Sequence, residues 1–148
     1  MQLLNAIFGA GMTSKLFVNV REKLSLCYFV GSGYYGSKGI VTVAAGIDFD
    51  KEEVTRREIL HQLEECKRGN ITAQELTAAK EAILSSLRAT HDAPGSIEAY
   101  YATAALSGMG MTTAEYMAAV EQVPMEQVIA AAGTVQLHTT YFLKGGSQ

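Results

Sequence analysis

Residues 9–28, GAGMTSKLFVNVREKLSLCY, place a glycine turn, a helix and the start of a strand in one short stretch. The Thr-Ser pair after the turn suits a helix N-cap, and apolar residues then recur at helical spacing, which predicts a helix over 14–23. From Leu26 the residues become apolar, aromatic and β-prone, which predicts a strand. Arg21 and Tyr28 therefore lie on the two sides of a helix-to-strand junction, where both side chains could leave the same end of a sheet.

The remaining pattern predicts a helix-rich chain with few strands. Asp50, Thr72 and Thr112 each have a glutamate three residues later, which is the capping-box signature of a helix start. Helices are predicted over 2–8, 50–67, 72–89, 97–107, 112–122 and 124–133, strands over 26–35, 40–47 and 136–143, and a tail from 145. This order is not βαβ alternation. It fits an α+β fold in which helices pack on one face of a mainly antiparallel sheet, as a single domain over 1–148.

Composition argues against several classes of function. The net charge is −3 and no run of lysine or arginine occurs, so nucleic acid is not expected as a partner. No apolar stretch approaches the length of a membrane span, and the first residues lack the layout of a signal peptide, so we expect a cytoplasmic protein without a membrane partner. Cys27 and Cys66 are too few and too isolated for a disulfide framework, and they are predicted to be reduced thiols.

A zinc site is not expected in this chain. The sequence motifs of zinc hydrolysis are HExxH and the inverted HxxEH, and neither is present. The nearest approach is His61 with Glu64 and Glu65, in which a glutamate stands where the second histidine of the inverted motif would be. His91 and His138 are far apart in the sequence and have no carboxylate or cysteine at ligand spacing. All three histidines are interpreted as structural or solvent-exposed.

Nucleophilic catalysis has equally little support from the sequence. Cys27 lies in a predicted strand without a nearby histidine, which favours an inert thiol. Ser14 is not in the strand-turn-helix context of a nucleophile elbow, and the glycine turn before it lacks a phosphate-binding motif. An α+β enzyme that uses Cys27 or His61 is retained as an alternative.

The stretch LNAIFGAGMTSKLFVNVREKLSLCY resembles the signature of the C-terminal, inactive domain of the M16 zinc peptidases, the family of pitrilysin, insulinase and the mitochondrial processing peptidase. The residues on the family pattern are Leu4, Asn5, Gly9, Gly11, Ser14, Leu16, Phe17, Arg21, Glu22, Lys23, Leu26 and Tyr28, and the departures are Phe8, Ala10 and Lys15. The resemblance implies a LuxS-like metallohydrolase half-domain. Its first strand, which precedes the helix at 2–8, is missing here, so the chain is expected to be a fragment of a longer protein.

The resemblance also gives Arg21 and Tyr28 a role. In M16 peptidases the matching pair reaches across to the zinc site of the N-terminal half, contacts substrate carbonyls and stabilises the developing oxyanion. Arginine offers a fixed cation with several donors and tyrosine offers one directed donor, which suits that task. By residue type alone, a surface arginine paired with a carboxylate beside a packed strand tyrosine is the simpler interpretation.

The first functional hypothesis is therefore the non-zinc-binding half of a bacterial, cytoplasmic M16 metallopeptidase. Its substrate would be a peptide, its partner the zinc-bearing half or subunit, and the chain alone would be inactive. Zinc is expected in the parent protein or the partner subunit, with no cofactor or metal in this chain, and a dimer is possible. The alternative is a non-catalytic scaffold or partner subunit, since several members of the resembled family have lost catalysis.

Overall fold

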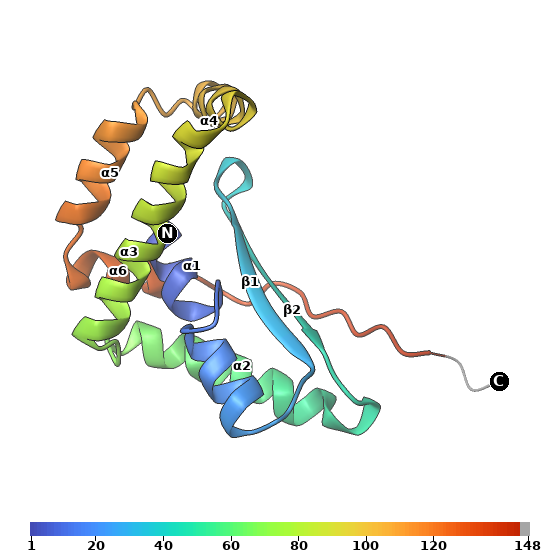
Figure 1. Cartoon of the computed structure of the whole chain (residues 1–148). Coiled ribbons are helices and arrows are strands. Elements are labelled where there is room, and N and C mark those ends of the chain that lie inside the picture. The colour runs from blue at the N-terminus through green and yellow to red at the C-terminus, as the bar shows by residue number, and fades with distance from the viewer. Residues whose placement is uncertain (146–148) are drawn as a thin grey trace.

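The computed structural model describes residues 1–145 and joins a layer of helices to a long β-hairpin (Figure 1). The α-helices are α1 (Gln2–Phe8), α2 (Glu52–Lys67), α3 (Ala73–Ala89), α4 (Pro94–Leu106), α5 (Thr113–Gln122) and α6 (Met125–Gly133). The strands are β1 (Phe29–Tyr35) and β2 (Ile40–Gly46), and a π-helix, η1 (Leu16–Lys23), precedes β1. The predicted α+β class is confirmed, whereas the predicted tail at 146–148 lies outside the described residues.

The sheet consists of β1 and β2 within the described part of the chain. The strands pair antiparallel, from Phe29 opposite Gly46 to Tyr35 opposite Ile40, which confirms the predicted hairpin. The connection ends at Gly39, whose φ of 63° is in the left-handed region that glycine adopts at little cost. β1 starts three residues later than predicted. Ser25 has a φ of 49°, the amide of Leu26 still donates to the carbonyl of Val20 in η1 at 3.0 Å, and the pairing with β2 begins at Phe29.

The hydrophobic core lies within the helical layer, beside the hairpin. Apolar residues at helical spacing in α1 meet η1 and the inner faces of the later helices. The buried apolar set is Leu3, Leu4, Ile7, Phe8, Leu16, Val20, Leu63, Cys66, Ile71, Ala79, Leu84, Leu87, Ala104, Val120, Val128 and Ala132. None of the residues of β1 or β2 is in this set, but β1 contacts α1 and η1, and its Val30 packs against the core. As predicted, the helices lie on one side of the sheet (Figure 1).

The helix predicted over 14–23 forms as η1, with the wider turn of a π-helix. The amide of Leu24 donates to the carbonyl of Asn19, five residues back, at 3.2 Å. Ser14 acts at its start, because its hydroxyl donates to the carbonyl of Gly11 at 2.7 Å and accepts from the amide of Phe17 at 3.4 Å. Short π-helical segments are frequent at functional sites, and this one carries Arg21 in its last turn.

Two of the three predicted capping boxes are confirmed. At α3 the hydroxyl of Thr72 accepts from the amide of Glu75, and Thr112 with Glu115 does the same at α5. The box predicted from Asp50 is wrong, since residues 49–51 form a 3₁₀ turn and α2 starts after Lys51 without a side-chain cap. That extra turn moves the helix start beyond the expected cap.

The strand predicted over 136–143 is also wrong. These described residues are extended but belong to no strand. Alternating side chains alone do not make a strand, because the backbone must also form hydrogen bonds with a neighbouring strand. β1 and β2 pair with each other, and the segment runs past the hairpin to Phe49, whose ring lies 5.6 Å from Lys144 Nζ.

The burial of Cys66 gives a testable pH dependence. Burial raises the pKa of the Cys66 thiol from its ordinary value near 9 to about 11. Between these values the unfolded chain loses the proton and the folded chain keeps it, so the stability that this group contributes is present below pH 9 and is lost as the pH rises to 11. The loss amounts to roughly 3 kcal/mol for a gap of that size.

We expect urea unfolding to show a steeper fall in stability above pH 9 for the wild type than for Cys66→Ala. Below pH 9 Cys66→Ala should be less stable than the wild type because it removes a fully buried side chain, so the slopes are compared and not the absolute values. Tyrosines that ionise in the same pH range change the stability of both proteins equally, so they do not affect the difference between the slopes. Parallel curves would contradict the assignment.

Candidate functional site

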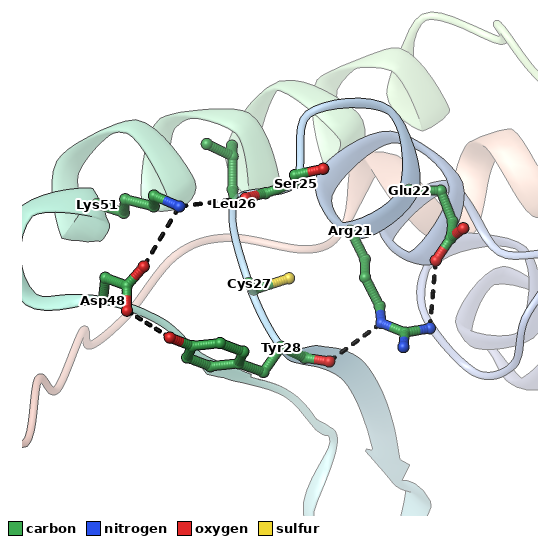
Figure 2. Close-up of a pocket in the computed structure, with 8 residues that line it drawn as sticks. All are labelled: Arg21, Glu22, Ser25, Leu26, Cys27, Tyr28, Asp48 and Lys51. Atoms are coloured by element: carbon green, nitrogen blue, oxygen red, sulfur yellow. Dashed lines mark hydrogen bonds and ion pairs between the residues drawn. The ribbon is translucent and has the colours of Figure 1, made fainter.

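Arg21 and Tyr28 lie at the same end of the hairpin, where η1 passes into β1. Both residues line an open cavity of about 430 Å³ (Figure 2). Its lining residues are Arg21, Glu22, Ser25, Leu26, Cys27, Tyr28, Asp48 and Lys51. The sequence places the two predicted site residues together because a short helix-to-strand junction cannot separate them.

The guanidinium of Arg21 is held in place by three neighbours. Its Nε donates to the carbonyl oxygen of Tyr28 at 3.0 Å, and its Nη1 lies 3.2 Å from a carboxylate oxygen of Glu22. The ring of Phe17 lies 4.8 Å beneath it, a cation–π contact. The Arg21 side chain is nevertheless 40% exposed, and within residues 1–145 its Nη2 makes no hydrogen bond or ion pair. That nitrogen can donate to a ligand.

The side chain of Tyr28 points away from Arg21 and toward Asp48 (Figure 2). Its hydroxyl donates to Oδ1 of Asp48 at 2.6 Å, a short bond of the kind that a charged acceptor produces. The Tyr28 side chain is 70% exposed, so a ligand can reach it. The hydrogen bond to Asp48 raises the pKa of the Tyr28 phenol, and the same bond, together with Lys51, lowers the pKa of the Asp48 carboxyl.

Asp48 and Lys51 complete the site, and the sequence did not reveal either. Lys51 Nζ lies 3.3 Å from Oδ2 of Asp48 and donates to the carbonyl of Ser25 at 3.3 Å. Both residues follow β2, twenty or more positions beyond Tyr28, and reach the junction only because the hairpin folds back on itself. A carboxylate just after a predicted hairpin strand was the available signal, but it does not identify its partner.

Residues 1–83 match the family profile of the peptidase M16 inactive domain, more than half of the chain. The chain belongs to this family. A curated relative from Bacillus subtilis, "Probable inactive metalloprotease YmfF", is 33% identical over 145 residues, which cover 98% of this chain and 34% of the relative. An "Uncharacterized zinc protease" from Rickettsia felis is 38% identical over 88 residues, which cover 58% of this chain and 21% of the relative. The M16 domain described here thus spans about a third or less of these relatives.

Solved structures have the same fold. A conserved protein from Enterococcus faecalis superposes with a TM-score of 0.82 at 30% identity, over 89% of this chain and 31% of that chain. The peptidase M16 inactive domain from Pseudomonas fluorescens gives a TM-score of 0.75 at 23% identity, over 88% of this chain and 32% of that chain. The predicted membership of the M16 family and the predicted fold class are therefore confirmed.

The donor set of this M16 domain does not fit a zinc ion. Glu64 is paired with Lys67 at 2.8 Å, and Glu65 accepts from Asn70 at 2.6 Å, so the carboxylates nearest to His61 are already engaged. Among the described residues no group of three or more histidine, cysteine or acidic side chains is close enough to hold a metal. No catalytic step is therefore assigned to a metal on this chain.

Cys27 lines the cavity but is poorly suited to nucleophilic attack. Burial raises the pKa of its thiol, and the nearby charge of Arg21 only partly opposes that effect. Since the thiolate is the reactive form, a raised pKa lowers its population near neutral pH. The Cys27 thiol is better described as part of the cavity wall.

Proposed function

We propose that this M16 domain is the non-zinc-binding half of a peptidase, and that Arg21 and Tyr28 hold the peptide substrate against the catalytic half. The observation that carries the proposal is the open cavity that an anchored arginine and an exposed tyrosine both line. A peptide lying there offers a carbonyl to each.

The chemistry of the pair suits a carbonyl oxygen that gains negative charge. Arg21 contributes a permanent cation whose Nη2 has no partner among the described residues, and Tyr28 contributes one hydroxyl donor. Donors fixed before the reaction stabilise developing charge without reorganisation, and such stabilisation supplies much of the rate enhancement in many acyl-transfer enzymes. Arg21 is fixed by contacts to Tyr28 O and to Phe17, so it meets this condition.

The proposal assigns zinc and the general base to the other half or to a partner subunit. Two Rickettsia relatives carry the name "Uncharacterized zinc protease", which supports a zinc-bearing parent protein. The isolated chain is then expected to cleave no peptide. A bacterial, cytoplasmic location belongs to the same proposal and is supported only by the composition and by the bacterial origin of these relatives.

A scaffold role is the second candidate, and a specific observation favours it. One relative that matches almost the whole chain is named as a probable inactive metalloprotease. In that case the domain would bind a peptide or a catalytic subunit without taking part in turnover. Binding of a labelled peptide that depends on Arg21, in an assembly without hydrolysis, would identify this role.

Tyr28→Phe tests the catalytic proposal. In the complete assembly with its zinc-bearing half, we expect kcat for short internally quenched peptides to fall roughly tenfold, since one directed donor to the developing charge is lost. The melting temperature should change little, because the Tyr28 ring is largely exposed. Fluorescence kinetics and calorimetry give the two readouts.

Tyr35→Phe is the matched control. It removes the same hydroxyl from an exposed tyrosine at the other end of β1, far from the cavity in the hairpin register. Turnover should match the wild type in this variant. Equal rates for Tyr28→Phe and the wild type would exclude a catalytic role for Tyr28 and leave the scaffold role.

A further inference from the structure

We infer that Asp48 is a positioning residue that holds the hydroxyl of Tyr28 away from the substrate until the substrate competes for it. The inference rests on the proposed function of Tyr28 and goes beyond it, since it names the residue that governs when that donor is available. It follows from the contacts among Tyr28, Asp48 and Lys51, which all line the cavity (Figure 2).

The first step concerns the single proton of a phenol. Tyr28 donates that proton to Oδ1 of Asp48 at 2.6 Å, so the hydroxyl cannot donate to a substrate carbonyl at the same time. Arg21 is in a different position, because its Nη2 has no partner among the described residues. The two residues therefore differ in their ability to donate to a substrate. Among the described residues the Nη2 donor of Arg21 has no partner, whereas the hydroxyl of Tyr28 already donates to Asp48.

The second step concerns what Asp48 does when the tyrosine leaves. Lys51 Nζ lies 3.3 Å from Oδ2 of Asp48, the oxygen that Tyr28 does not use. The Asp48 carboxylate therefore keeps a cationic partner after the phenol has turned toward a substrate. Lys51 is itself tied to the Ser25 carbonyl at 3.3 Å, which holds the carboxylate near the junction.

The third step compares the acceptors. A carboxylate is a stronger acceptor than a neutral peptide carbonyl, so Asp48 keeps the phenol while the substrate is in its ground state. The balance shifts when the carbonyl oxygen gains negative charge during the reaction, because two charged acceptors then compete. An interaction that strengthens only as charge develops raises kcat, whereas one made equally to the ground state only lowers KM. Asp48 therefore gives Tyr28 selectivity for the transition state.

The energy scale permits this exchange. Tyr28 is largely exposed, and the side chain of Asp48 is 46% exposed, so water can replace either partner as the hydrogen bond breaks. Breaking an exposed hydrogen bond to a charged group, such as that of Tyr28 to Asp48, should weaken substrate binding by a factor of roughly five. This is enough to affect affinity without preventing binding.

Asp48→Ala in the assembled peptidase is the test. With the phenol released, we expect KM for short internally quenched peptides to fall roughly fivefold, while kcat falls or stays the same. Asp50→Ala is the matched control, because Asp50 is an exposed carboxylate two residues away that does not contact Tyr28. It should leave both constants unchanged.

The double variant separates action through Tyr28 from a general loss of negative charge. In the Tyr28→Phe background, Asp48→Ala should have no effect on KM, because there is no hydroxyl to release. A fall in KM that persists without the hydroxyl, or an unchanged or raised KM in the single variant, overturns the inference.

A titration of the chain checks the contact independently of turnover. NMR of tyrosine labelled at the ring Cζ should show that Asp48→Ala returns the pKa of the Tyr28 phenol toward its ordinary value, whereas Asp50→Ala does not. If Tyr28→Phe leaves turnover unchanged, the proposed function fails and the inference fails with it. If Tyr28→Phe slows turnover but Asp48→Ala does not lower KM, only the inference fails.

Discussion

Replacing Arg21 with alanine in the assembled peptidase should lower kcat/KM for peptides about 100-fold, more than any other single change at the site. The substitution removes a fixed cation and its open donor. It also removes the hydrogen bond from Nε to the Tyr28 carbonyl, at 3.0 Å, so the chain that carries the second donor loses an anchor. Stability should fall by less than about 1 kcal/mol, because the ion pair of Arg21 with Glu22 is exposed.

Steady-state kinetics with internally quenched peptides measures this effect, and Arg56→Ala is the control. Arg56 pairs with Glu52 at 3.2 Å on α2 and its side chain is 45% exposed, close to the 40% of Arg21. Arg21→Lys should recover only part of the rate, since an ammonium keeps the charge but lacks the planar group that bonds Tyr28 O and stacks on Phe17. Full activity of Arg21→Ala would exclude a catalytic role for this residue.

Gly9→Ala is expected to have the largest effect on stability, with a loss of about 2–3 kcal/mol. A Cβ at this position would lie 2.5 Å from Ser32 Oγ, 2.7 Å from Ser32 Cβ and 2.8 Å from Leu16 Cδ1. Leu16 is fully buried, and Ser32 is fixed to β1, where its amide donates to the Gly9 carbonyl at 3.1 Å. Neither neighbour can move without disturbing the junction of the hairpin with the helices.

Urea unfolding of Gly9→Ala should show a lower midpoint with an unchanged slope. Gly133→Ala is the control, since an added Cβ at the end of α6 meets no atom within 4 Å and stability should stay equal or rise slightly. Combining Gly9→Ala with Ser32→Gly removes the two closest contacts and should recover part of the loss. If the double variant is no more stable than Gly9→Ala, crowding by Ser32 is not the cause.

The parts of the fold that the sequence predicted correctly depend on neighbours in the chain. The capping box of Thr72 with Glu75 closes within three residues, and the hairpin is set by a turn that ends at Gly39. The capping box predicted from Asp50 failed for a local reason, the 3₁₀ turn at residues 49–51, whereas the third strand failed for want of a distant partner. Residues 136–143 have the alternation of a strand, but whether they pair is decided by β1 and β2, which pair with each other.

The site residues also fall into those that the local sequence predicts and those that it does not. Arg21 and Tyr28 are seven residues apart on one helix-to-strand junction, so local pattern and family resemblance suffice to bring them together. Asp48 lies twenty residues beyond Tyr28 and meets it only through the register of the hairpin. Its carboxylate gives no sequence signal of that contact. The direction of the Tyr28 hydroxyl is likewise a property of the tertiary structure.

The bond from Arg21 to the Tyr28 carbonyl, 3.0 Å long, makes the two residues unequal partners. The arginine supports the main chain from which the tyrosine extends, but among the described residues the phenol gives the guanidinium no support in return. If the proposed function holds, a lineage that replaces the tyrosine first should keep an arginine that still binds a peptide carbonyl. A lineage that replaces the arginine first should lose that donor and also the anchor of the tyrosine's main chain. Relatives that have given up hydrolysis but still bind peptides should therefore more often retain the arginine alone than the tyrosine alone.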